Sequence, residues 1–140
     1  MTAVRDRLVG SWRLVSYATR DAAGRTGAPY GVAVGRLTYD ALGNMSGQVM
    51  RPERARVEVG PGNAQSARAA YVGYIAYFGS YEVAADGGSV THLVEGALNS
   101  EWVGGTQVRA LRFAGAHLVL SADVRRNGDL VTHTLTWEKR

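Results

Sequence analysis

The sequence contains no cysteine, a single lysine and only three prolines among its 140 residues. Without cysteine, the chain has no disulfides, no thiolate metal ligands and no cysteine nucleophile. No apolar run approaches the roughly 18 residues that a membrane-spanning helix needs. The start, Met1 to Asp6, carries an acid and lacks an apolar stretch, so we expect no signal peptide. We therefore predict a soluble, cytoplasmic protein that folds without cross-links.

Basic residues outnumber acidic ones, 16 against 12, giving a net charge of +4. They are spread from Arg5 to Arg140, and they adjoin only at Arg125-Arg126 and Lys139-Arg140. No basic helix or stripe of the kind that binds nucleic acid or an anionic membrane emerges. We expect neither partner, and infer only a mild attraction for small anions.

The usual cofactor and catalytic motifs are missing as well. The sequence has no phosphate-binding Gly-x-x-x-x-Gly-Lys loop, no Gly-x-Gly-x-x-Gly that opens a helix, and no Gly-x-Ser-x-Gly elbow. His92, His117 and His133 lie on three different predicted strands without the short spacing typical of a zinc site. We expect no cofactor and no metal.

Glycine, in contrast, is abundant: 18 residues, most of them between short apolar alternations. This pattern predicts strands joined by tight turns, and Asn127-Gly128 is typical of a two-residue hairpin. Eight antiparallel strands can close into a barrel that is just wide enough to hold side chains or one small ligand, and closure removes the exposed sheet edges. We expect one domain over residues 1–140. The predicted strands are residues 9–19, 35–40, 44–50, 77–84, 89–97, 106–113, 117–123 and 130–138.

Two segments interrupt this pattern. Residues 51–62 begin with Arg51-Pro52 and end with Gly60-Pro61-Gly62, which predicts a loop. From Asn63 onward, Tyr71, Tyr74, Ile75 and Phe78 follow helical spacing, which predicts one helix over about residues 63–76 near the barrel mouth. Its apolar stripe either packs on the barrel or lines the pocket as a lid.

An ordered set of short motifs resembles the lipocalin-like family of small bacterial and fungal single-domain proteins. The first is the Gly-x-Trp signature, Gly10-Ser11-Trp12, on the first predicted strand. The others are residues 35–40, 43–46, 50–52, 73–83, 92–96, 102–104, 107–109 and 135–138. The resemblance covers nearly the whole chain. It implies an all-β, eight-stranded antiparallel lipocalin-like barrel with a central cavity, but no single activity.

Strand alternation predicts which polar side chains face that cavity. His92 shares a face with apolar neighbours and is expected to point inward, whereas Glu95 lies on the opposite face. A His92–Glu95 general-base pair would therefore need an intervening bulge, and we discount it. His133 lies on the same face as Leu135 and Trp137, and is the second inward histidine. Trp12 is expected to be a core side chain.

Arg109 is the most informative of these candidates. Leu111 and Phe113 share its face, which favours that face as the inner one, although the alternation of residues 106–113 leaves the direction open. A buried guanidinium keeps its charge and needs a partner, and no acid is evident on the inner faces. Arg109 therefore points to a ligand with an anionic or carbonyl group.

Two function hypotheses follow. In the first, the cavity binds a small, largely apolar organic molecule with a carbonyl or anionic group. The predicted ligand-binding residues are Arg109, Trp102, Tyr74, Tyr77, Tyr39, Met45, Leu111 and Trp137. In the second, by analogy with other lipocalin-like barrels, the protein is a cofactor-independent cyclase or isomerase of polyketide-type secondary metabolism. There His92, His133 or Tyr81 would transfer protons while Arg109 polarises a carbonyl. Homodimer formation is left open.

Overall fold

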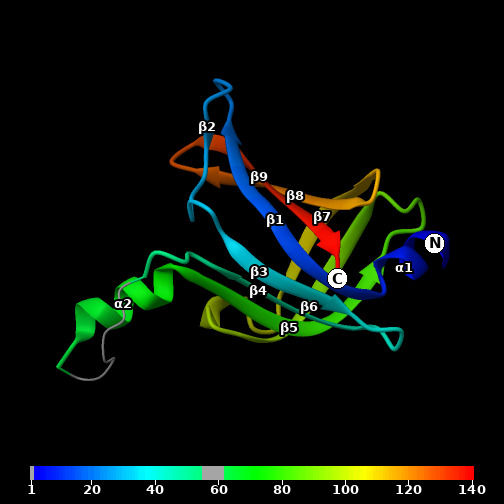
Figure 1. The fold of residues 1–140 in the computed structure, drawn as a ribbon, viewed down its shortest axis with the longest axis horizontal. Coiled ribbons are helices and arrows are strands. Elements are labelled where there is room, and N and C mark those ends of the chain that lie inside the picture. The colour runs from blue at the N-terminus through cyan, green and yellow to red at the C-terminus, as the bar shows by residue number, and fades with distance from the viewer. Residues whose placement is uncertain (1, 55–61) are drawn as a thin grey trace.

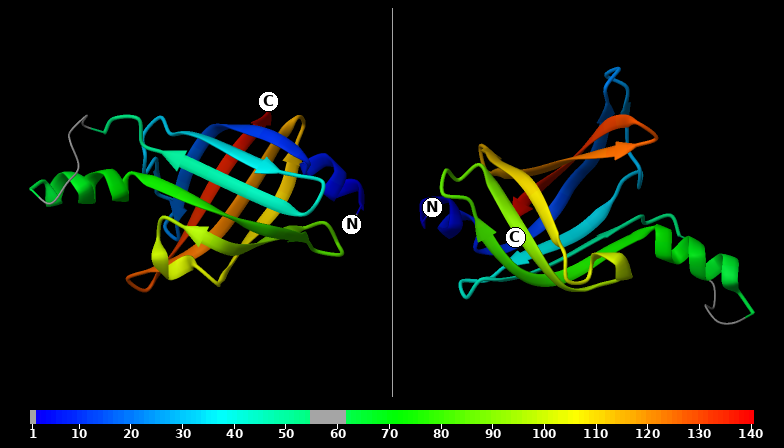
Figure 2. Two further views of the ribbon diagram at one scale, coloured as in Figure 1. Left: turned by 90° about the horizontal axis from the view of Figure 1, so that it is seen from below. Right: turned by 180° about the vertical axis from the view of Figure 1, so that it is seen from behind.

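The computed structural model describes residues 2–54 and 62–140, and its strands form a closed antiparallel barrel (Figure 1). Eight strands follow each other around the barrel, and the last pairs with the first (Figure 2). The predicted all-β, eight-stranded lipocalin-like barrel is thereby confirmed. A two-residue strand, β2 (Thr26–Gly27), is added beside β1 and was not expected. The barrel strands are β1 (Gly10–Asp21), β3 (Val34–Tyr39), β4 (Asn44–Met50), β5 (Tyr74–Val83), β6 (Ser89–Ala97), β7 (Thr106–Ala114), β8 (His117–Arg126) and β9 (Asp129–Lys139).

The seam between β1 and β9 contains a β-bulge between Leu14 and Ser16. Trp12 and Leu14 point into the barrel before the bulge, and both are buried. Val15 is 44% exposed, and the next buried side chain is Tyr17 rather than an even-numbered residue. The extra residue thus reverses the alternation and turns Tyr17 inward.

The hairpin between β8 and β9 forms as predicted. Arg126 pairs with Asp129, which leaves Asn127 and Gly128 as a two-residue turn. Both turn residues have positive φ angles, 51° and 83°. These are the values of a type I′ turn, which asparagine and glycine tolerate best.

The helix α2 (Ala64–Val72) is shorter than expected. Tyr74 and Ile75 belong to β5, so the helical reading of these two residues was wrong; Phe78, which shared the helical spacing, also lies in β5, within the predicted strand 77–84. Their backbone pairs with β4, and this pairing outweighs the local helical spacing. No described side chain of α2 is buried, and the helix projects from the barrel end rather than covering it (Figure 2). Of the predicted loop, residues 55–61 lie outside the described part.

A second helix, α1 (Thr2–Leu8), was not expected from the sequence; seven residues are too few to show a clear helical period. It lies at the opposite end of the barrel from α2 (Figure 1). Leu8 is fully buried, and its carbonyl accepts a hydrogen bond from Trp12 Nε1 at 2.9 Å. Lys139 Nζ donates to the carbonyls of Arg7 at 2.9 Å and Val9 at 2.7 Å, which ties the C-terminus to α1.

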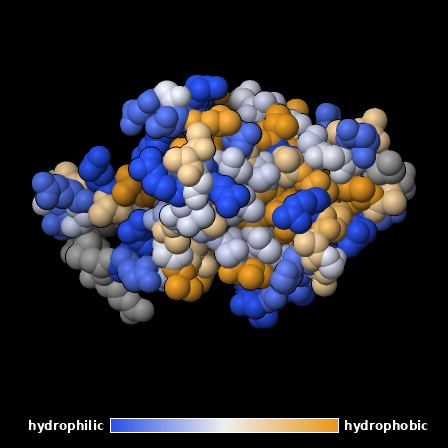
Figure 3. Space-filling model, turned by 90° about the horizontal axis from the view of Figure 1, so that it is seen from above, coloured by the Kyte–Doolittle hydropathy of each residue, from blue (hydrophilic) through white to orange (hydrophobic). Residues whose placement is uncertain are grey.

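The hydrophobic core lies inside the barrel, and Trp12 is part of it as expected. The buried residues of this core are Leu8, Trp12, Leu14, Tyr17, Ala33, Leu37, Tyr39, Met45, Val49, Tyr81, Val90, Leu111, Leu118, Leu120 and Trp137. On the face shown in Figure 3, hydrophobic areas are interrupted by hydrophilic side chains. Among the described residues, no helix has the length and apolarity to cross a membrane.

Replacing the buried side chain of α1 tests its contribution to stability. We expect Leu8→Ala to lower the free energy of unfolding by about 2–5 kcal/mol, because it leaves a cavity under the helix. Leu42→Ala is the matched control: Leu42 is 88% exposed, and its replacement should cost less than about 0.5 kcal/mol. Urea denaturation of the two variants measures both values. Equal losses would show that α1 does not contribute to the core.

Candidate functional site

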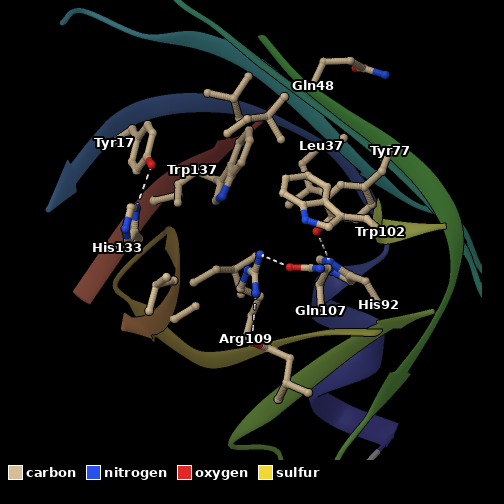
Figure 4. A pocket seen from close by; sticks show the side chains of 18 of the residues that line it. Tyr17, Leu37, Gln48, Tyr77, His92, Trp102, Gln107, Arg109, His133 and Trp137 are labelled. Carbon is tan, nitrogen blue, oxygen red and sulfur yellow. Dashed lines mark hydrogen bonds between the residues drawn. The ribbon is translucent and has the colours of Figure 1, made fainter. Parts of the chain in front are cut away.

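A cavity of about 560 Å³ occupies the barrel half away from α1 (Figure 4). Its size is within the range of pockets that hold small organic ligands. Most of its wall is apolar, with side chains from five strands that include Leu37, Val49, Ile75, Leu120 and Leu135. The polar side chains come from seven strands, with the largest group on β7: Tyr17, Gln48, Tyr77, His92, Thr106, Gln107, Arg109, Asp123 and His133.

His92 on β6 is 2% exposed and is held by two tyrosine hydroxyls. Its Nε2 lies 2.6 Å from the Tyr39 hydroxyl and its Nδ1 lies 2.6 Å from the Tyr77 hydroxyl. Burial, and then the positive charge of Arg109, lower the pKa of His92 to about 3. The ring is therefore neutral at pH 7. Because both nitrogens are engaged, His92 exchanges a proton with a ligand only through Tyr77.

The His92–Glu95 pair does not form. A register shift between β5 and β6 leaves Glu95 as the unpaired extra residue of a bulge. The bulge does not turn its carboxylate inward, and Glu95 is exposed. The hydrogen-bond partners of the His92 ring are the hydroxyls of Tyr39 and Tyr77 instead of a carboxylate.

Arg109 lies on the inner face of β7, the face it shares with the buried Leu111. Its Nη2 donates to Gln107 Oε1 at 2.9 Å and its Nη1 donates to the Val108 carbonyl at 3.0 Å. The ion pairs found among the described residues, Arg13–Glu138 and Arg25–Asp21, do not include it.

The acid nearest to the cavity does not compensate this charge. Asp123 lines the cavity, but its carboxylate accepts a hydrogen bond from Thr132 at 2.6 Å. In the β8–β9 register, Ala122 pairs with His133, and both face the cavity. Asp123 pairs with Thr132, the next pair along the two strands, and this pair lies on the opposite face of the sheet. The guanidinium therefore brings a positive charge into the cavity without a carboxylate partner.

Trp137 on β9 adds an unused hydrogen-bond donor. The residue is 3% exposed, and its Nε1 has no hydrogen-bond partner among the described residues. Figure 4 shows the ring nitrogen turned into the cavity. A buried donor without a partner costs about 1–3 kcal/mol, so its presence in a cavity wall calls for an explanation.

Tyr17 and His133 form a second pair on the other side of the cavity. The Tyr17 hydroxyl lies 2.7 Å from His133 Nδ1. Burial raises the pKa of Tyr17 to about 12, and burial followed by the charge of Arg109 lowers the pKa of His133. Sequence reasoning missed Tyr17, because simple alternation from Trp12 places it outside. Only the bulge in β1 brings it in.

The structure brings six of the predicted site residues together in the cavity wall: His92, His133, Arg109, Trp102, Tyr77 and Trp137. The other five predicted residues are not part of the lining. Met45, Leu111 and Tyr39 are buried in the core, Tyr39 behind His92. Gln107, which holds Arg109, was not predicted.

Tyr81 and Tyr74 are the other two predicted site residues that lie outside the lining. Tyr81 points to the α1 end of the barrel, where its hydroxyl donates to the Asp40 carbonyl at 2.7 Å and its ring lies near the Arg5 guanidinium. Tyr81 therefore lies away from the cavity. The Tyr74 ring packs against Arg54 at the start of β5. In the part of the chain that the structure describes, no three histidine or acidic side chains form a metal-binding group, and His117 is exposed.

Eight antiparallel strands closed around such a cavity form the type of barrel that holds either side chains or one small ligand. The model of the lipocalin-like domain matches residues 9–140. The chain therefore belongs to the lipocalin-like domain family, which confirms the resemblance of its sequence motifs. This fold suggests small-molecule binding in general. Searches of curated proteins and of solved structures gave no match.

The low pKa of His92 predicts how stability depends on pH. The unfolded chain has a histidine pKa near 6.5 and therefore binds an additional proton between about pH 3 and 6.5. His92 thus stabilises the fold fully above this window, and its contribution is lost as the pH falls. We expect about 1.4 kcal/mol per pH unit from this residue in urea titrations. His92→Gln should remove this contribution, whereas His133→Gln should remove only the contribution of His133, whose pKa burial also lowers, and keep that of His92. An unchanged slope in His92→Gln would contradict a neutral buried His92.

Proposed function

We propose that the protein binds a small, largely apolar organic molecule that carries a carbonyl or anionic group, inside the barrel cavity. The single observation that carries this proposal is Arg109, a cation on the inner wall for which the described residues supply no carboxylate. An arginine cannot lose its charge to escape burial. A ligand oxygen would provide the missing partner, and the apolar walls would bury the rest of the molecule.

Energetics favour an anion over a purely apolar ligand. An apolar molecule that displaces water from Arg109 leaves the charge desolvated and unpaired, which opposes binding. A carboxylate or similar group forms charge-assisted hydrogen bonds with the guanidinium fork, and can do so through two N–H groups at once. Trp137 lines the same cavity as Arg109, and its indole N–H is a further hydrogen-bond donor.

A matched pair of fluorescent probes tests this preference. Anilinonaphthalene sulfonate is an apolar anion, and phenylnaphthylamine is its neutral counterpart without the sulfonate. We expect Arg109→Gln to weaken binding of the anion at least tenfold, the equivalent of one lost charge-assisted hydrogen bond, and to change binding of the neutral probe little. Fluorescence titration gives both dissociation constants.

Arg112→Gln is the control for this experiment. Arg112 is exposed on the outer face of the same strand, so its replacement changes the net charge by the same amount outside the cavity. If both variants weaken binding of the anion equally, the probe responds to overall charge and the role of Arg109 is refuted. If neither probe binds the native protein, the binding proposal itself fails.

A second function, a cofactor-independent cyclase or isomerase, is supported by a separate observation. Tyr77, hydrogen-bonded to neutral His92, lines the same cavity as Arg109. A phenolic hydroxyl beside a cation can donate a proton to a carbonyl oxygen while the cation stabilises the developing negative charge. In this proposal Tyr77 meets the substrate, and His92 acts through it.

Incubation of the native protein with a small-molecule extract of its host, followed by mass spectrometry, separates the two functions. A binding protein should retain one compound in stoichiometric amount and release it unaltered on denaturation. A cyclase or isomerase should convert a compound, over many turnovers, into an isomer of equal mass. Absence of conversion with stoichiometric retention would exclude the second function for that compound.

A further inference from the structure

The hydroxyl of Tyr39 determines the hydrogen-bond direction of the whole Tyr39–His92–Tyr77 chain. Tyr39 is 1% exposed, and its hydroxyl has one hydrogen-bond partner among the described residues, His92 Nε2. A buried O–H group that has one available acceptor donates to it, because otherwise its hydrogen is left without a partner. Tyr39 is therefore the donor, and Nε2 of His92 is the acceptor.

The direction propagates through the ring. A neutral imidazole has one N–H and one acceptor nitrogen, so a His92 that accepts at Nε2 is protonated at Nδ1. The Nδ1–H group then donates to the Tyr77 oxygen, 2.6 Å away. The hydrogen of the Tyr77 hydroxyl consequently remains available to a partner in the cavity. The charge of Arg109 supports this state, since it opposes a second proton on His92.

We infer that Tyr77, Arg109 and Trp137 form a donor-only site that recognises a ligand oxygen bearing no hydrogen, such as that of a carboxylate, phenolate, enolate or ketone. This inference rests on the proposed binding function and specifies the chemistry of its polar end. Tyr77 is the specificity-determining contact. Tyr39, which does not line the cavity, is a positioning residue that acts through His92.

Arg109 and Trp137, the other two members of the site, have N–H groups that are not used in the described hydrogen bonds. Arg109 has five N–H groups, of which the described contacts use two, on Gln107 and Val108. The indole of Trp137 is a donor only, and it has no partner. The three residues come from β5, β7 and β9 and surround one space (Figure 4). A ligand hydroxyl or amine that presented its own hydrogen here would meet further donors and leave them unsatisfied.

The tautomer of His92 tests the inference without any ligand. In a long-range proton–nitrogen correlation spectrum of the native protein, we expect His92 to be neutral and protonated on Nδ1. A proton on Nε2 would overturn the inference, because Tyr77 would then donate to the ring instead of to the cavity. This measurement needs no variant and is independent of whether binding is detected.

Ligand selectivity is the second test. The probes are para-nitrophenolate, whose oxygen bears no hydrogen, and para-nitroaniline, whose amino group at the same position presents its own hydrogens, at a pH where the phenol is fully ionised. We expect the native protein to bind the phenolate at least tenfold more tightly. Tyr77→Phe and Tyr39→Phe should each reduce this ratio about fivefold or more, with little change for the aniline.

Tyr81→Phe is the matched control, because it removes a hydroxyl that is bonded to Asp40 and not to His92. We expect it to leave the ratio unchanged. If Tyr77→Phe retains the native ratio, the donor role of Tyr77 is overturned, whereas the binding proposal stands. If neither probe binds the native protein while His92 carries its proton on Nδ1, the binding proposal fails and the site with it. Loss of the ratio in Tyr77→Phe but not in Tyr39→Phe would refute the positioning role.

Discussion

The pairing of β1 with β9 is the contact on which the rest of this structure depends. It converts a sheet into a barrel, and it gives every strand a face that is excluded from bulk water. The bulge at Val15 adapts the seam by reversing the alternation of β1, so that Tyr17 joins the interior. At one end of the barrel, α1 contributes the fully buried Leu8 to the core, and part of the interior remains as the cavity.

Closure has a consequence for polar groups, because inside the barrel each of them needs a partner from the walls. His92 obtains two partners, Tyr39 and Tyr77, and burial keeps it neutral. The same exclusion of water strengthens the interactions of the groups that remain without partners. Among the described residues, the indole of Trp137 is such a group, and Arg109 keeps unused N–H groups beside its contacts with Gln107 and Val108; both residues lie in the cavity wall.

The interior thus contains two kinds of polar group: those whose hydrogen bonds are made within the barrel walls, and those with unused donors. The satisfied groups form a chain that begins in the core at Tyr39 and reaches the cavity at Tyr77. The groups with unused donors are a cation and a neutral indole. Under the proposed function, this division would let a cavity with mostly apolar walls select for the polar end of its ligand, and it is compatible with either binding or proton transfer there.

Features set by neighbouring residues could be predicted from the sequence. Strand alternation placed His92, His133 and Trp137 on inner faces, and Asn127-Gly128 specified its turn, because both depend on local backbone geometry. For Arg109 the alternation only favoured the inner face, and the structure decided it. Other features depend on which strands meet across the barrel. The hydroxyl partners of His92 come from β3 and β5, two other strands. Likewise, the inward Tyr17, the strand conformation of Tyr74 and Ile75, and the unpartnered indole of Trp137 among the described residues arise from bulges, strand pairing and packing, and no local pattern records them.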